Sequence, residues 1–400
     1  MTRPTTTGKA QDLITFTRST TGTALAKISY GEELVTNGTF DNESGWTLTS
    51  YLSISNGKLN FNGVNTGFIG ASQPVAFVSG KLYSISVDVE SVTSGSWQVF
   101  VQRTSGDLVI NSGLVAGSFT GNYVADGTET NLYVARNNLT VLVASVDNVS
   151  VKEVSFDQPD GTLQLFNHPI NKPRIEYDAS GNCLGLLVEE ARTNLIAYSE
   201  ALFYASNRAI AESSLSPTGE QTAQTWRVNG SASGEPYWYG NPNIVSGTTY
   251  TCSVFVRLPT SGPTVESRYV KLTSQTRMQA GAAVFDLQEG TVVSSNMLSE
   301  SITPVGNGWY RLSATNTATS SGASFSFILW PCINAAGDLY VISANDDGKA
   351  LLETFGMQTE AGSFPTSYIP TSGSAVTRAA DVASLAVSEF GYNQDQGSFV

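Results

Sequence analysis

Histidine is almost absent from this sequence, which holds one in 400 residues, His168. Ser-His-Asp and Cys-His catalysis both depend on an imidazole. His168 precedes Pro169 in a stretch that we expect to be a linker, where a histidine is typically exposed and without a role. No glycine-rich phosphate loop follows a strand and opens a helix either. We therefore expect a protein that is not an enzyme.

Cysteine is also scarce. Cys183, Cys252 and Cys332 form an odd, widely spaced set, which excludes a disulfide framework and has no metal-ligand spacing. We expect reduced thiols that pack in the core, with a Cys252–Cys332 bridge as the open alternative. Glycoside hydrolysis requires only two carboxylates, so 34 acidic residues leave that chemistry open.

Charged residues make up only 14% of the chain, and its net charge is −13. Phosphate binding requires clustered Lys and Arg, so the negative net charge argues against binding to nucleic acid and to an anionic membrane. Long hydrophobic runs are missing, and residues 1–5 have no apolar signal-peptide region. We expect the protein to be made in a cytoplasm and not to be exported by the general secretory route.

Short strands with alternating apolar residues are abundant, separated by glycine-containing turns and without a helical period. This pattern predicts β-sandwiches. The stretch 79–89 aligns without gaps on 246–256, which indicates two related modules. We predict an all-β fold of tandem jelly-roll β-sandwiches joined by a central β-hairpin junction.

The predicted hairpin begins at Pro-Arg-Ile-Glu-Tyr-Asp, 173–178, and returns through 184–188 after an Asp-Ala-Ser-Gly-Asn turn. A polar cluster follows it: Glu189, Glu190, Arg192 and Asn194. We favour a salt-bridged support for a domain junction. A catalytic carboxylate pair is the alternative, although nothing nearby in the sequence supplies a second chemical partner.

Segment 173–199 resembles a signature of phage virion proteins, chiefly head-spike, fibre and tail proteins. The short motif 16–19 and the stretches 364–371 and 377–381 resemble other parts of the same proteins. One departure is that 203–207 lacks the tryptophan usual after Tyr-Ser-Glu. The resemblance implies a virion protein, into whose framework a first module is inserted.

Five segments follow from these observations. They are an N-terminal attachment segment (1–32), a first jelly roll (33–154), a linker with the central hairpin (155–198), a second jelly roll (199–371), and the start of a further C-terminal sandwich or a docking tail (372–400). The resemblance would make that further sandwich laminin-G-like or concanavalin-like.

The two ends of the first module resemble jelly-roll carbohydrate-binding modules. It opens on Asn-Gly-Thr-Phe at 37–40 with Gly-Trp at 45–46, and it closes on Asp-Asn-Val at 147–149. That resemblance implies that the ends pair in one sheet and hold a structural calcium, for which Asp41 and Asp147 are the natural oxygen donors. No other cofactor is expected.

Aromatic residues supply the candidate ligand site. Sugar rings stack on Trp and Tyr planes. Tyr237, Trp238 and Tyr239 lie between glycine and proline residues, where we expect some exposure; glycan stacking and loop packing are both open. The same two interpretations apply to Trp97. We expect Trp46, Trp309 and Trp330 to be structural and to lie inside.

We therefore predict a virion appendage, a head spike, fibre or tail fibre, that attaches to host surface polysaccharide. Its other expected partners are further virion proteins and two more copies of itself, as a homotrimer. The alternatives are a purely structural adaptor or capsid decoration, and a polysaccharide depolymerase whose catalytic domain is absent from this chain.

Overall fold

The computed structural model describes residues 14–63, 67–137, 141–156, 160–200, 203–204, 208–260, 262–323 and 326–385. Apart from the short 3-10 helix η1 (Ala344–Asp346), the regular structure in these ranges is β strand. The predicted all-β class is thus confirmed. Among the described residues, no helix is long and apolar enough to cross a membrane.

The chain divides into two compact units. The smaller comprises Lys27–Thr162 with Gly219–Gln221, and the larger comprises Met1–Ala26, Leu163–Thr218 and Thr222–Val400. The chain leaves the larger unit and later returns to it, as expected for an inserted module. Predicted segment 33–154 lies within the smaller unit.

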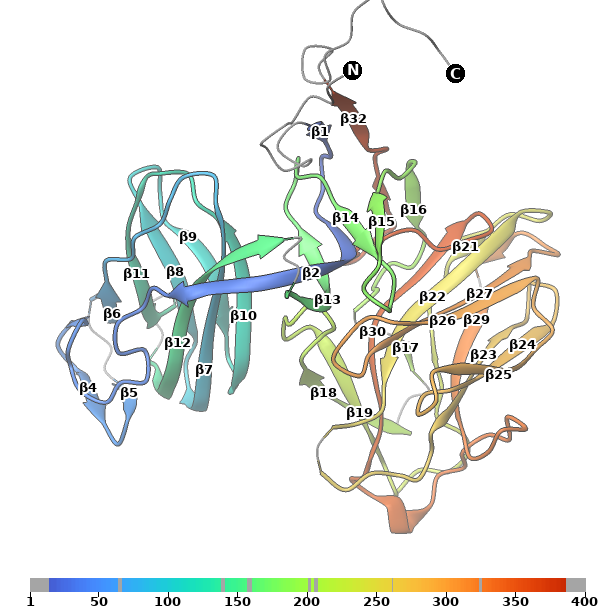
Figure 1. Ribbon diagram of the computed structural model, residues 1–400. Helices are drawn as coiled ribbons and strands as arrows, with labels where there is room; N and C mark the ends of the chain where they lie inside the picture. The colour runs from blue at the N-terminus through green and yellow to red at the C-terminus, as the bar shows by residue number, and fades with distance from the viewer. Residues whose placement is uncertain are drawn as a thin grey trace, which may run out of the picture. The chain divides into compact units, whose positions relative to one another are not determined.

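The smaller unit is a two-sheet sandwich (Figure 1). Its first sheet has the order β5 (Lys58–Asn62), β12 (Val143–Phe156), β7 (Leu82–Ser94), β10 (Gly117–Val124), with β4 (Leu52–Ser55) paired to β5 and β2 (Gly22–Glu33) paired to β12. Its second sheet has the order β3 (Thr47–Leu48), β6 (Gly70–Gln73), β11 (Glu129–Arg136), β8 (Trp97–Arg103), β9 (Leu108–Gly113). When the strands are lettered along the chain, these sheets read B-I-D-G and C-H-E-F, the order of a jelly roll.

The larger unit repeats this topology. One sheet has the order β18 (Ala209–Ser214), β19 (Ala223–Val228), β30 (Ala350–Ala361), β22 (Thr249–Arg257), β27 (Tyr310–Thr317), β26 (Ser299–Pro304). The other has the order β17 (Phe203–Tyr204), β20 (Trp238–Tyr239), β29 (Phe327–Cys332), β23 (Tyr269–Ser274), β24 (Gly281–Asp286), β25 (Thr291–Ser295). The B-I-D-G strands are β19, β30, β22 and β27, and the C-H-E-F strands are β20, β29, β23 and β24. Tandem jelly rolls are therefore confirmed.

The sequence similarity between 79–89 and 246–256 has a structural counterpart. These stretches enter β7 and β22, the D strand of each module. The hydroxyl of Tyr83 accepts a hydrogen bond from the Val78 amide at 2.8 Å, and that of Tyr250 accepts one from the Val245 amide at 3.0 Å. Both partners lie five residues before the tyrosine, so an equivalent turn closes in the same way in both modules.

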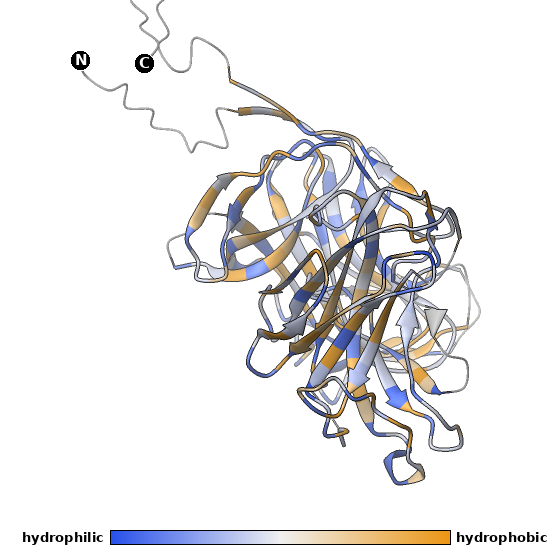
Figure 2. Cartoon of the chain, turned by 90° about the vertical axis from the view of Figure 1, so that its right-hand side faces the viewer, coloured by the Kyte–Doolittle hydropathy of each residue, from blue (hydrophilic) through white to orange (hydrophobic). Residues whose placement is uncertain are grey.

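Alternation along the strands builds the cores. In β22 the side chains of Cys252, Val254 and Val256 point into the sandwich, where they meet Trp226 and Leu329. Figure 2 shows hydrophobic and hydrophilic segments alternating along many strands, as expected when one face is buried. Cys252 and Cys332 are buried free thiols without a bridge between them, so core packing is confirmed for these two. It is wrong for Cys183, which is exposed in the β14–β15 hairpin.

Short two-stranded sheets form the junction of the larger unit. The predicted hairpin is present as β14 (Ile175–Tyr177) paired with β15 (Cys183–Leu186), and Asp178 accepts from the amides of Ser180 and Asn182 in its turn. The junction also contains the pairs β1 (Ile14–Thr17) with β32 (Val382–Leu385) and β16 (Arg192–Asn194) with β31 (Val376–Arg378). A further pair, β21 (Asn243–Ile244) with β28 (Gly322–Ala323), lies within the second jelly roll.

The junction packs on one outer face of the second jelly roll. Phe255 and Phe355 point outward from the B-I-D-G sheet and form a separate apolar cluster with Leu25, Leu165 and Tyr368. Leu165 belongs to β13 (Thr162–His168). The expectation that His168 is exposed is wrong: it is 2% exposed, because the end of β13 lies beneath other junction segments.

Segment 372–400, predicted to begin a further sandwich or a docking tail, is described only to residue 385. Its described part returns to the larger unit, as β31 beside β16 and β32 beside β1. Residues 386–400, and residues 1–13 of the predicted attachment segment, lie outside the described residues.

Candidate functional site

The stretch Tyr237-Trp238-Tyr239 leads into a strand rather than forming an open loop. Trp238 in β20 is fully buried, and its ring lies 5.3 Å from that of Trp226 in the core. The expected exposure of Trp238 is therefore wrong. Alternation sends its side chain inward and leaves Tyr237 and Tyr239 half-buried on the outer face of the C-H-E-F sheet.

A third aromatic residue joins the two tyrosines on this face. Trp330 in β29 is half-buried, and its ring centroid is 4.8 Å from that of Tyr237. The rings of Tyr237 and Tyr239 are 5.9 Å apart. The indole Nε1 of Trp330 donates to Thr273 Oγ1 at 3.0 Å, which fixes the ring. We call Tyr237, Tyr239 and Trp330 the aromatic platform.

Two cations flank the aromatic platform. Lys271 is the cross-strand partner of Trp330, and its Nζ donates to the Gly337 carbonyl at 2.7 Å. The Arg208 guanidinium lies 5.9 Å from the Tyr237 ring centre and donates to the Glu235 carbonyl at 2.8 Å. Because each cation is tied to a backbone carbonyl, its position beside the rings is defined.

The other tryptophans are structural. Trp97 is fully buried, its ring centroid lies 4.5 Å from that of Phe119, and its Nε1 donates to the Val115 carbonyl at 3.1 Å. Of its two interpretations, core packing is therefore right and glycan stacking is wrong. Trp46 and Trp309 are inside as expected. Trp330 is the exception, because strand alternation directs it outward.

The proposed calcium donors lie in different local structures: Asp41 follows a turn, and Asp147 lies within strand β12. Asp41 is exposed and accepts from the Thr39 hydroxyl, and Asp147 accepts from the Asn148 amide. Across the described ranges, no group of three or more His, Cys, Asp and Glu side chains is placed to hold a metal. The donors present do not by themselves make a calcium site, so calcium stays a prediction for this module.

A carboxylate also links the two ends of the first module. Glu33 accepts from the amides of Val35 and Val151 at 2.9 and 2.8 Å and from the Ser150 hydroxyl at 2.5 Å. The end-to-end pairing that the resemblance implied is therefore present, and a protein side chain supports it.

The junction of the larger unit is organised around Arg174. This fully buried side chain bonds Glu189 at 2.8 Å and Asp381 at 2.7 Å through one nitrogen. Its other terminal nitrogen donates to the Thr23 carbonyl at 3.0 Å and to the Ser367 hydroxyl at 2.7 Å. Four distant chain segments thus meet at one guanidinium group.

Two more buried arginines complete this network. Arg378 lies 2.8 Å from Glu189, and Arg18 donates to backbone carbonyls, including that of His168 at 3.2 Å. Burial would raise the pKa of Glu189, but the Arg174 and Arg378 charges hold that pKa below its ordinary value. Burial, with the neighbouring Arg174 charge, lowers the pKa of Arg18 to about 10. Each of the four stretches that resemble virion proteins therefore contributes a side chain to one buried network: Arg18, Arg174, Ser367 and Asp381.

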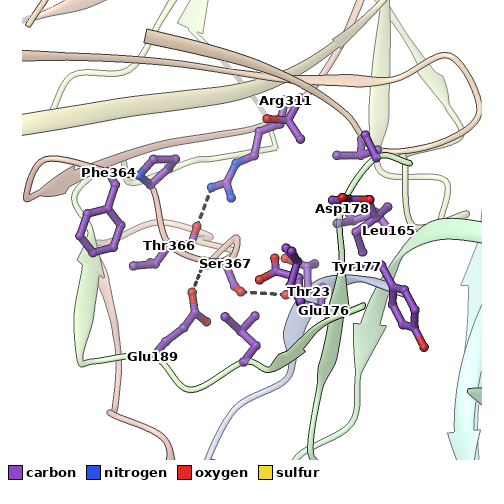
Figure 3. A pocket seen from close by; sticks show the side chains of 18 of the residues that line it. Thr23, Leu165, Glu176, Tyr177, Asp178, Glu189, Arg311, Phe364, Thr366 and Ser367 are labelled. Carbon is purple, nitrogen blue, oxygen red and sulfur yellow. Dashed lines mark hydrogen bonds between the residues drawn. The ribbon is translucent and has the colours of Figure 1, made fainter. Parts of the chain in front are cut away.

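A cavity of about 670 Å³ borders this network in the larger unit. Figure 3 shows Arg311 reaching toward Thr366, to whose carbonyl it donates at 2.6 Å, with Glu176 and Phe364 among the lining side chains. Burial and the Glu189 charge raise the pKa of Glu176. The Glu189 carboxylate forms ion pairs with Arg174 and Arg378 and accepts a hydrogen bond from the Ser367 amide. These contacts match the favoured interpretation of a salt-bridged support.

Comparisons with known proteins give likenesses at low similarity. No family model matches the chain, and no curated protein matches it significantly. A solved tandem CBM22 domain from Paenibacillus barcinonensis Xyn10C is 13% identical, with 85% of this chain and 100% of that chain covered and a TM-score of 0.27. An anti-sigma factor domain-containing protein is 10% identical, with 82% and 99% covered and a TM-score of 0.16. Neither likeness supports an inference about function.

Proposed function

We propose that this protein attaches to glycans through the aromatic platform of its second jelly roll. The observation that carries this proposal is the placement of Tyr237, Tyr239 and Trp330 together on an outer sheet face, half-exposed and held in position. Aromatic planes stack on the apolar faces of sugar rings. The polar groups that orient a sugar would come from the platform's edge.

Lys271 and Arg208 indicate the chemical class of sugar. Both cations stand beside the platform, and both retain donor hydrogens beyond the single carbonyl bond that fixes each. Such donors suit the carboxylate of an acidic sugar, because charge-assisted bonds are the stronger ones. The proposed ligand is an acidic polysaccharide of a host surface.

The virion setting of this activity rests on the resemblance of 16–19, 173–199, 364–371 and 377–381 to phage head-spike, fibre and tail proteins. The protein is then an appendage that presents its modules to the host, without catalysis of its own. Its other partners are virion proteins and, by analogy with spikes and fibres, two further copies of itself. Light scattering that finds a stable monomer at micromolar concentration would contradict the trimer.

The test of glycan binding uses the full chain on an array of purified bacterial capsular polysaccharides and lipopolysaccharides. Trp330→Ala and Tyr237→Ala should each weaken binding by about 1–3 kcal/mol if the rings stack on sugars. Phe364→Ala is the matched control, because Phe364 is 54% exposed and lines the cavity instead of the platform.

Four results separate the alternatives. Binding lost in the platform variants and kept in Phe364→Ala supports the proposal. Binding lost only in Phe364→Ala moves the site to the cavity. Release of reducing sugars from a bound polysaccharide supports the depolymerase alternative, and no binding by the unsubstituted chain supports the adaptor.

A further inference from the structure

The inserted module carries a second group of aromatic side chains on an outer sheet face. The rings of Phe100 in β8 and Tyr133 in β11 lie parallel, with an interplanar angle of 2° and a centroid distance of 4.8 Å. Phe68 meets both rings edge-on, 5.6 Å from Tyr133 and 6.3 Å from Phe100, and it is 49% exposed. We call Phe68, Phe100 and Tyr133 the second platform.

The second platform lies on the outer face of its sheet, and its accessible rings are those of Phe68 and Tyr133, because Phe100 between them is only 5% exposed. Val99, Val101, Leu132 and Val134 alternate with Phe100 and Tyr133 along the same two strands and fill the sandwich. Phe100 and Tyr133 are cross-strand partners, and Phe100 is also paired with Val109, which is 50% exposed. Packing of the sandwich core does not explain these aromatic rings, because the rings lie on the opposite face of the sheet from the core.

Uncharged amide side chains lie beside the second platform, whereas cations lie beside the aromatic platform of the second jelly roll. Gln102 follows Phe100 by two residues on the same face, and Asn131 precedes Tyr133 by two. Asn131 Nδ2 donates to Gln102 Oε1 at 3.0 Å, which orients both amides. Each amide keeps a donor or acceptor for a further bond. Uncharged amides beside aromatic planes suit the hydroxyl groups and C–H faces of a neutral sugar.

The two platforms occupy equivalent places in the two jelly rolls. Tyr133 and Trp330 lie on the H strands, β11 and β29, and Phe100 and Lys271 lie beside them on the E strands, β8 and β23. Phe68 and Tyr237 each lie just before the C strand of their module. The residue types differ while the place is the same, which favours one inherited surface with two chemistries.

We propose that Phe68 and Tyr133, backed by the buried ring of Phe100, form a second saccharide-binding face, which takes an uncharged stretch of polysaccharide. This rests on the proposed glycan attachment and extends it: one chain carries a site for acidic sugars and a site for neutral ones. Two sites on one chain raise apparent affinity for a polymer beyond that of either site alone when both can engage it.

The test uses the full chain and the same array, sorted into neutral and acidic polysaccharides. Phe68→Ala and Tyr133→Ala should weaken binding to the neutral members about tenfold or more, the loss expected when one stacking ring is removed. Tyr133→Phe should retain binding, because it keeps the ring. Tyr30→Ala is the control, since Tyr30 is 47% exposed on β2, in the other sheet. Thermal unfolding of each variant checks that the module is folded.

Every outcome bears on this inference. Neutral binding that survives Trp330→Ala and disappears with Tyr133→Ala supports it. Binding to the array that depends on Trp330 and is unchanged in Phe68→Ala and Tyr133→Ala overturns the second face and leaves the first. An unsubstituted chain that binds no polysaccharide overturns both. Loss of a virion-protein partner in Tyr133→Ala, with the array signal unchanged, shows that the face docks protein and also overturns the inference.

Discussion

Acidification should destabilise the larger unit through its buried histidine. Burial, together with the Arg174 and Arg18 charges, lowers the pKa of His168 from 6.5 to about 3. In the unfolded chain the same imidazole takes a proton near its ordinary pKa of 6.5. The folded state therefore binds fewer protons than the unfolded state between these values, so stability is complete above pH 6.5 and falls as the pH drops below it.

The size of this effect follows from linkage. Each pH unit below 6.5 costs about 1.4 kcal/mol until the folded pKa is reached. At pH 5 the loss is about 2 kcal/mol relative to neutral pH, and it stays close to that value for any folded pKa below about 4. Burial raises the pKa values of Glu176 and Glu200, so those groups favour the folded state on acidification. The comparison must therefore isolate the histidine.

The chain's single histidine makes the assay direct. Protein labelled with carbon-13 only at histidine gives one imidazole signal, from His168. In folded protein we expect no titration of this signal between pH 8 and pH 5. Denaturant unfolding of the unsubstituted chain and of His168→Gln at pH 7.5 and pH 5 should show the extra loss of about 2 kcal/mol only where the histidine is present. A titration midpoint near 6.5 in the folded protein would refute the reasoning.

Three further predictions concern stability. Arg174→Met should cost about 3–5 kcal/mol, because Asp381 is left charged and buried; Arg227→Met, which breaks the more exposed pair with Glu212, should cost under about 1 kcal/mol in the same unfolding experiment. Trp238→Ala should lower the stability of the larger unit by about 3–5 kcal/mol through a core cavity; an unchanged melting curve would contradict its burial. If calcium binds the first module, a chelator should lower the melting temperature of the smaller unit in the intact chain by removing a ligand of the folded state, and an unchanged curve would end the calcium hypothesis.

At the junction, the local sequence pattern predicts the role of the polar cluster but not its contacts. The sequence predicts that the polar cluster after the hairpin is a salt-bridged support, because Glu189, Glu190 and Arg192 lie close together with no catalytic partner nearby in the sequence. The side chains that contact Arg174 from other parts of the chain cannot be predicted in this way. Asp381 lies 207 residues from Arg174, and Ser367 lies 193 residues from it, so only the folded chain brings them into contact.

The candidate site shows the opposite limit. The Gly and Pro residues around Tyr237-Trp238-Tyr239 suggest a loop and conceal a two-residue strand. With the strand unseen, alternation cannot be applied, and Trp238 is mistaken for an exposed ring. The same rule, applied to 327–332, would have placed Trp330 opposite in direction to Leu329 and so outside the core. Phe68, Phe100 and Tyr133 lie in three separate stretches that share no motif.

By itself the sequence determined the class of fold, the number of modules and the hairpin between them, because strand alternation, turn residues and an internal repeat are local properties of the chain. Only the tertiary structure decided which face each aromatic ring occupies and which charges are buried together. Those outcomes depend on strand pairing and sheet packing, which join residues far apart in the chain, and they assign the rings of Tyr237 and Trp330 to the surface while those of Trp97 and Trp238 fill the cores.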